Sequence, residues 1–101
     1  MKVLVVDDEI YMRSLIEYNL IKKGIEVVSA TNALEALEKV EKESFDLILT
    51  DIDMPEMNGY EFCKKLKDNI TTKEIPIIII SCKSQEADIK KGFDCGVRDY
   101  V

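Results

Sequence analysis

Five short apolar runs alternate with helical stretches along the chain, and this alternation constrains the fold more than any other feature. The runs cover residues 2–6, 26–30, 45–50, 77–81 and 99–101, and helical spacing of apolar residues marks 10–23, 33–40, 60–69 and, more weakly, 84–92. Strands that are separated by helices pair in parallel through right-handed crossovers, with helices on both faces of the sheet. The pattern therefore predicts a three-layer α/β/α domain with a five-stranded parallel sheet.

Each predicted helix carries a boundary signal or an apolar face. The first ends before Gly24, and the second follows Asn32, with Glu35 placed as in a capping box. The side chains expected to face the core are Met12, Leu15, Ile16 and Leu20 in the first helix, and Phe62, Cys63 and Leu66 in the third. The run at 77–81 is apolar at consecutive positions, which is typical of a strand covered on both faces.

Length and charge limit the possible functions. The 101 residues suffice for one domain, placed at 1–101, and the net charge of −6 argues against direct nucleic-acid binding, which needs a basic patch. No apolar run is long enough to span a bilayer, so no membrane insertion is expected, and three widely spaced cysteines suit a reducing cytoplasm. The chain has no histidine, which excludes a Ser-His or Cys-His nucleophile pair within it.

Polar side chains follow three of the predicted strands. Asp7 and Asp8 follow the first strand, Asp51 follows the third, and Ser81 ends the fourth. Open parallel sheets bind ligands outside the carboxyl ends of their strands, so these side chains should share one edge. Two like charges about 4 Å apart cost roughly 4 kcal/mol at a surface-like dielectric, so this cluster needs a proton or a bound cation. Oxygen ligands of this kind suit Mg²⁺ or Mn²⁺.

A cation beside a strand-end carboxylate points to phosphoryl chemistry. The cation neutralises charge on a phosphoryl group, and a carboxylate such as Asp51 can be the nucleophile. The competing interpretation is that Asp7 or Asp8 merely caps the helix that follows. Acids on matching ends of two strands in an acidic α/β protein favour the phosphoryl site.

The stretch LILTDIDMPEMNG reaches Asp51 at the end of a strand and then turns at once. Pro55 cannot extend a sheet. Asn58 and Gly59 are expected to adopt the left-handed backbone of the turn before the next helix. Such a loop would stop the strand abruptly and leave Asp51 facing solvent.

In these motifs the chain resembles the receiver domain of bacterial two-component response regulators. The matching segments are, in order, VLVVDDE at 3–9, LILTD at 47–51 with Met54, Pro55 and Gly59, IIIIS at 77–81, and GVRDYV at 96–101. The resemblance covers the whole chain and implies a flavodoxin-like sheet with strand order 2-1-3-4-5. It implies a signalling domain rather than an enzyme, which accepts a phosphoryl group from a histidine kinase or phosphotransfer protein and then changes conformation.

The resemblance also implies roles for single residues. Asp51 matches the phosphoacceptor, Asp8 a direct Mg²⁺ ligand, and Asp7 an acid that acts through water. Asp53 matches the residue whose backbone carbonyl completes the metal shell. The implied cofactor is Mg²⁺, or Mn²⁺ in its place.

Three other positions match the family's switch and its control. Ser81 matches the hydroxyl that moves toward the phosphoryl group, and Tyr100 the aromatic side chain that changes rotamer with it. Lys83 and the side chain of Asp53 match positions that set the lifetime of the phosphoryl group, and we expect them to pair and to slow attack by water. The alternatives are a solvated Lys83 at a helix start and a half-buried edge-strand Tyr100.

The sequence departs from the family after Val101. Receivers continue the fifth strand into a lysine, a proline and a final helix, so this pattern predicts a domain truncated before that helix. Apolar surface of the last two strands would then be exposed. Three explanations stay open: the chain is a fragment, a second copy covers this surface in a homodimer or swapped assembly, or a partner chain supplies the missing part. We also expect that Mg²⁺ still binds, but that a phosphoryl analogue binds poorly because the positive charge of the family's lysine is missing.

Two other functions remain open at this level. A truncated or degenerate receiver would act as an interaction or dimerisation module without phosphorylation. A phosphatase of the haloacid dehalogenase type would use Asp51 and Asp53 as its Asp-x-Asp motif. In that class the motif normally follows the first strand and the core is longer. Turnover of an aryl phosphate distinguishes such a phosphatase from a phosphoaccepting receiver.

Overall fold

The computed structural model describes residues 1–52, 54, 56–80 and 99–100. Along the chain the elements are β1 (Lys2–Val6), α1 (Ile10–Lys22), β2 (Glu26–Ala30), α2 (Ala33–Lys42), β3 (Leu47–Thr50), α3 (Gly59–Lys67), β4 (Ile77–Ile79) and β5 (Asp99–Tyr100). The helix predicted at 84–92 lies outside the described residues. Within the described ranges, no helix has both the length and the apolar character needed to cross a membrane.

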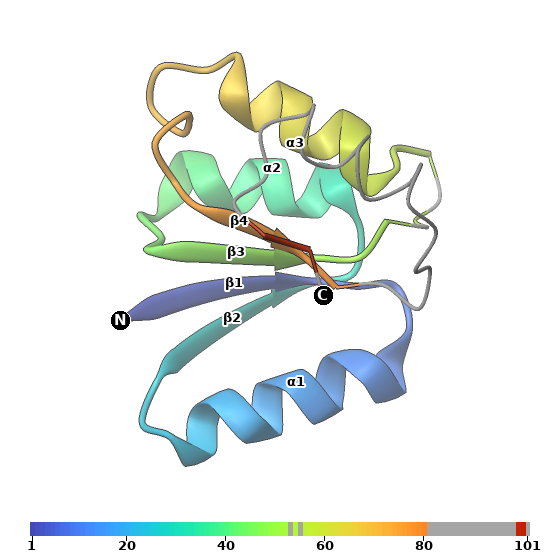
Figure 1. The fold of residues 1–101 in the computed structure, drawn as a ribbon, viewed down its shortest axis with the longest axis vertical. Coiled ribbons are helices and arrows are strands. Elements are labelled where there is room, and N and C mark those ends of the chain that lie inside the picture. The colour runs from blue at the N-terminus through green and yellow to red at the C-terminus, as the bar shows by residue number, and fades with distance from the viewer. Residues whose placement is uncertain (53, 55, 81–98, 101) are drawn as a thin grey trace.

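The strands form one parallel sheet in the order β2-β1-β3-β4-β5. This confirms the predicted fold class and strand order. Helix α1 covers one face of the sheet, and α2 and α3 lie together on the other (Figure 1). The crossovers therefore bring the carboxyl ends of β1 and β3 side by side at one edge.

The larger part of the core lies between the sheet and the α2–α3 layer. The predicted inner face of α3 is confirmed, because Phe62, Cys63 and Leu66 are all fully buried there. Alternate residues of β1 serve the two layers: Leu4 and Val6 join this cluster, whereas Val3 and Val5 face α1.

The prediction for the buried face of α1 is partly wrong. Ile16 and Leu20 pack on the sheet as expected, but Leu15 is 57% exposed. Apolar side chains occur around most of this helix, since Tyr11 and Tyr18 are exposed as well. Periodicity alone therefore did not identify which side of α1 faces the sheet.

The capping box predicted for the second helix forms only in part. Asn32 Oδ1 accepts a hydrogen bond from the Glu35 N–H at 2.8 Å, so Asn32 is the N-cap of α2. The Glu35 carboxylate instead accepts hydrogen bonds from the N–H and hydroxyl of Thr31. A complete capping box occurs at α3, between Asn58 and Glu61.

Candidate metal centre

Three carboxylates meet at the carboxyl edge of the sheet. In the β1–β3 pairing Val6 lies opposite Thr50, and the Asp51 N–H donates to the Val6 carbonyl at 3.0 Å. The next residues, Asp7, Asp8 and Asp51, each offer one carboxylate oxygen, and these oxygens all lie within 4.8 Å of one another. The convergence that the sequence predicted for these three residues is therefore present.

Asp7 is the buried member of the cluster, with only 4% of its surface exposed. Its Oδ1 accepts a hydrogen bond from the Glu9 N–H at 2.9 Å. Burial raises the pKa of Asp7 above its ordinary value; the hydrogen bond from Glu9 opposes this effect, and the neighbouring charge of Asp8 adds to it. A buried carboxylate beside other acids is electrostatically costly until a proton or a cation compensates it.

Asp51 is half-buried, and both its side chain and its backbone carbonyl accept hydrogen bonds. Its Oδ1 accepts a hydrogen bond from the Ile52 N–H at 2.8 Å, and its carbonyl accepts one from the Thr50 hydroxyl at 3.0 Å. Thr50 is itself held in the sheet, where its carbonyl accepts from the Ile80 N–H at 2.9 Å. The Asp51 carboxylate thus follows a strand end that is hydrogen-bonded on both sides in the sheet.

Glu9, rather than Asp7 or Asp8, is the N-cap of α1. Its carboxylate accepts hydrogen bonds from the N–H groups of Tyr11 at 3.1 Å and Met12 at 2.7 Å. The helix-cap interpretation of the two aspartates is therefore wrong. Glutamate is not a preferred N-cap residue, so no clear signal in the sequence marks it for this role.

The loop after Asp51 turns differently from the prediction. Among the described residues of this loop, Glu56 has a left-handed backbone, at φ 69°, whereas Asn58 is extended and caps α3. Gly59 is needed for close packing rather than for its dihedral angles. A Cβ at Gly59 would lie 2.3 Å from the Asp51 carbonyl oxygen and 2.9 Å from the Ile52 Cα.

Several predicted site residues are not among those described. Asp53, Pro55, Ser81 and Lys83 fall outside the described residues, and their roles stay predictions. Tyr100 lies in β5 with its backbone opposite Ile79. Its predicted rotamer switch likewise stays a prediction.

The three acids fit a small divalent cation. Their oxygens are hard donors, they lie within 4.8 Å of one another, and one of the three acids is buried at an energetic cost. Asp7, Asp8 and Asp51 are thus the described residues that could hold Mg²⁺ or Mn²⁺.

Replacement of Asp7 by asparagine should stabilise the metal-free protein at neutral pH. Because the folded state raises the pKa of Asp7, it binds the proton more tightly than the unfolded chain, so stability falls as pH rises from about 4 through the folded pKa. The asparagine side chain keeps the Oδ1 acceptor for Glu9 and cannot ionise. Urea unfolding in EDTA should show a stability gain at pH 7 that disappears at pH 3. A gain of equal size at both pH values would contradict the assignment.

Residues 3–101 match the response regulator receiver domain. The chain is 39% identical over 100 residues to the regulatory protein PhoP of Bacillus subtilis, and the match covers 99% of this chain and 41% of PhoP. It is also 39% identical over 103 residues to the chemotaxis protein CheY1 of Helicobacter pylori strain 26695, and that match covers 100% of this chain and 83% of CheY1.

The solved structure of chemotaxis protein CheY4 from Vibrio cholerae has a similar fold, with a TM-score of 0.94 and 34% identity; the match covers 99% of this chain and 83% of that one. The chain thus spans less than half the length of the transcriptional regulator PhoP and most of the length of the CheY proteins. Sequence and fold agree along nearly the entire chain. The chain belongs to the response regulator receiver domain family.

Proposed function

We propose that this chain is a phosphoacceptor of two-component signalling, which takes a phosphoryl group on Asp51 from the phosphohistidine of a partner histidine kinase or phosphotransfer protein. The observation that carries the proposal is the convergence of Asp7, Asp8 and Asp51 at the junction of β1 and β3. The exchange would take place in the cytoplasm, where ATP is available to charge the donor. The unit that performs it is the single domain 1–101.

The transfer is a substitution at phosphorus. A carboxylate oxygen of Asp51 forms a bond to the phosphorus while the bond from phosphorus to the donor's imidazole nitrogen breaks. The electron pair of that bond returns to the nitrogen, which takes a proton from solvent. The donor histidine lies outside residues 1–101, since these residues include no histidine.

Asp8 and Asp51 would bind a divalent cation directly, Asp7 would bind it through water, and the backbone carbonyl of Asp53 would complete the set. When bound, Mg²⁺ or Mn²⁺ supplies positive charge that offsets the charge on the phosphoryl oxygens. The chain's own contribution is to hold Asp51 at a fixed strand end. The hydrogen bonds at Ile52 N–H and Thr50 Oγ1 support this role.

Ser81 and Tyr100 would report the arrival of the phosphoryl group, the first by a hydroxyl contact and the second by a change of rotamer. Asp53 and Lys83 would set how long the group survives. These four assignments rest on the match of their positions to the family's motifs.

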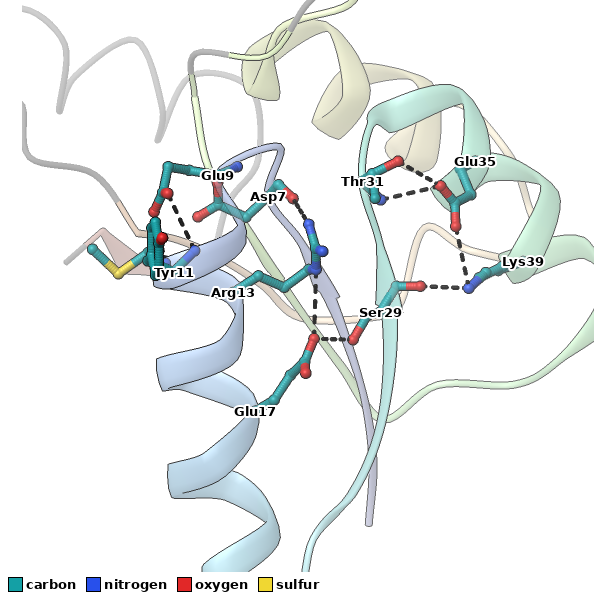
Figure 2. A network of polar contacts seen from close by, with 10 residues as sticks. Asp7, Glu9, Tyr11, Arg13, Glu17, Ser29, Thr31, Glu35 and Lys39 are labelled. Carbon is teal, nitrogen blue, oxygen red and sulfur yellow. Dashed lines mark hydrogen bonds and ion pairs between the residues drawn. The ribbon is translucent and has the colours of Figure 1, made fainter.

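The outer face of α1 is a suitable binding surface for the protein that donates the phosphoryl group. Tyr11, Leu15 and Tyr18 are 83%, 57% and 63% exposed, and their spacing places them on one side of the helix. Tyr11 lies next to Glu9 at the end of α1 that adjoins the acid cluster (Figure 2). An apolar row that leads to the acceptor suits a protein that must bring its phosphohistidine to Asp51.

Replacement of Leu15 by arginine should slow transfer from a protein donor about tenfold, because a charge would be placed in an apolar contact. Phosphorylation by acetyl phosphate should not change, since that donor needs no helix surface. Leu34→Arg is the matched control, because Leu34 is 45% exposed on α2 across the sheet. Equal slowing with both donors, or with both variants, would rule out this surface.

The proposal is tested by incubating the protein with a phosphorylated phosphotransfer protein and Mg²⁺, then measuring the phosphoryl group bound to each chain. Transfer that stops in EDTA supports the proposal. Continuous hydrolysis of an aryl phosphate would favour the phosphatase alternative. No incorporation from either a protein donor or acetyl phosphate would favour an interaction module.

A further inference from the structure

We propose that Arg13 is a positioning residue for the metal centre: it holds the Asp7 carbonyl so that the carboxylates of Asp7 and Asp8 stay directed at the site. The inference rests on the proposed metal-dependent function and adds a residue outside the ligand set. Its guanidinium Nη1 donates to the Asp7 carbonyl oxygen at 2.9 Å. The contact joins the first turns of α1 to the end of β1.

The Asp7 carbonyl belongs to the peptide that links Asp7 to Asp8. Rotation of this peptide would change the direction of both side chains relative to Asp51. The Asp7 side chain is already fixed by the Glu9 N–H at 2.9 Å. The hydrogen bond from Arg13 fixes the carbonyl of the same residue, and so restricts the direction in which the Asp8 side chain leaves the backbone.

Arg13 is itself held firmly. Its side chain is only 15% exposed, and its Nε lies 3.6 Å from Glu17 Oε1, one turn further along α1. The Glu17 carboxylate also accepts a hydrogen bond from the Ser29 hydroxyl of β2. The guanidinium is thus anchored to the neighbouring strand as well as to its own helix.

The support continues around the edge of the sheet. Lys39 of α2 donates to the Ser29 carbonyl and lies 3.4 Å from Glu35. Figure 2 shows one continuous chain of polar contacts from Asp7 through Arg13, Glu17 and Ser29 to Lys39. Side chains from α1 and α2, on opposite faces of the sheet, therefore both contact Ser29 of β2. These contacts support the position of Arg13.

The charge of Arg13 and its positioning role act in opposite directions on cation binding. A positive charge near the acids repels a divalent cation, so simple loss of charge should tighten binding. Loss of a group that orients metal ligands typically weakens binding by about 10–100-fold. The sign of the change in affinity therefore separates the two roles.

The test is titration of Mn²⁺ into the metal-free protein by calorimetry, with Arg13→Gln compared with wild type at a temperature where both are folded. The positioning role predicts about tenfold weaker binding for Arg13→Gln. The matched control is Lys22→Gln, which removes one positive charge at the far end of α1 and should leave the affinity unchanged. Affinity equal to wild type, or tighter, in Arg13→Gln would overturn the inference.

Two further variants keep the test decisive if Arg13→Gln fails to fold. Arg13→Lys keeps the charge but loses the guanidinium geometry, and Ser29→Ala keeps every charge but removes the hydroxyl that donates to Glu17. Both should bind Mn²⁺ more weakly than wild type, and wild-type affinity in both would refute the positioning role. Absence of Mn²⁺ binding by the wild type would instead overturn the proposed metal centre itself.

Discussion

Asp51→Asn should reduce phosphoryl incorporation to the background level. The substitution keeps the size of the side chain and the Oδ1 acceptor that receives the Ile52 N–H at 2.8 Å, so the strand end should stay folded. It removes the nucleophilic carboxylate, and an amide does not form a stable bond to phosphorus under these conditions. The measurement is incorporation of labelled phosphate from acetyl phosphate in Mg²⁺.

The control for charge is Asp68→Asn, in which an exposed acid at the C-cap of α3 is replaced. This variant should incorporate phosphate as the wild type does. If Asp51→Asn still accepted the label at the wild-type rate while remaining folded, Asp51 would not be the acceptor.

Gly59→Ala should destabilise the domain by about 1–3 kcal/mol, because a methyl group is forced into a site with no room for it. The new Cβ would lie 2.3 Å from the Asp51 carbonyl oxygen, so the acceptor's own backbone must move. Slower phosphorylation should therefore accompany the loss of stability. Urea unfolding and the rate of phosphorylation by acetyl phosphate are the two measurements.

Gly24→Ala is the matched control for this effect. Gly24 has φ 81°, and a Cβ there meets no atom within 4 Å, so its cost comes from backbone strain of about 1–2 kcal/mol. It follows α1 far from the acids, and phosphorylation should be unaffected. A normal phosphorylation rate in Gly59→Ala would show that the contact with Asp51 does not matter to the acceptor.

The sheet and the acid cluster were predictable because they follow from short-range patterns and one topological rule. Alternating apolar runs and helices determine a parallel sheet, and the carboxyl ends of its strands are where Asp7, Asp8 and Asp51 must gather. The capping role of Glu9 was missed because Asp7 and Asp8 precede it and are better N-cap residues by propensity. The structure instead uses the aspartates at the site and the longer glutamate at the helix.

The remaining wrong or missing predictions concern contacts that apolar periodicity and residue propensity do not encode. Leu15 was assigned to the core because α1 is apolar on several sides, and only packing on the sheet selects Ile16 and Leu20. Gly59 was expected to supply a left-handed turn, but its role is set by a contact with the backbone of Asp51. Arg13 likewise carried no local signal, since its partner, the Asp7 carbonyl, is a backbone atom.

The proposed role of Asp51 is tested most directly by locating the phosphoryl group on the chain. The protein is phosphorylated by acetyl phosphate with Mg²⁺ and then reduced with borohydride, which converts an aspartyl phosphate to homoserine, and the peptides are sequenced by mass spectrometry. We expect homoserine in place of Asp51 alone, and none when EDTA replaces Mg²⁺. Homoserine in place of Asp7 or Asp8, or equal labelling in EDTA, would contradict it.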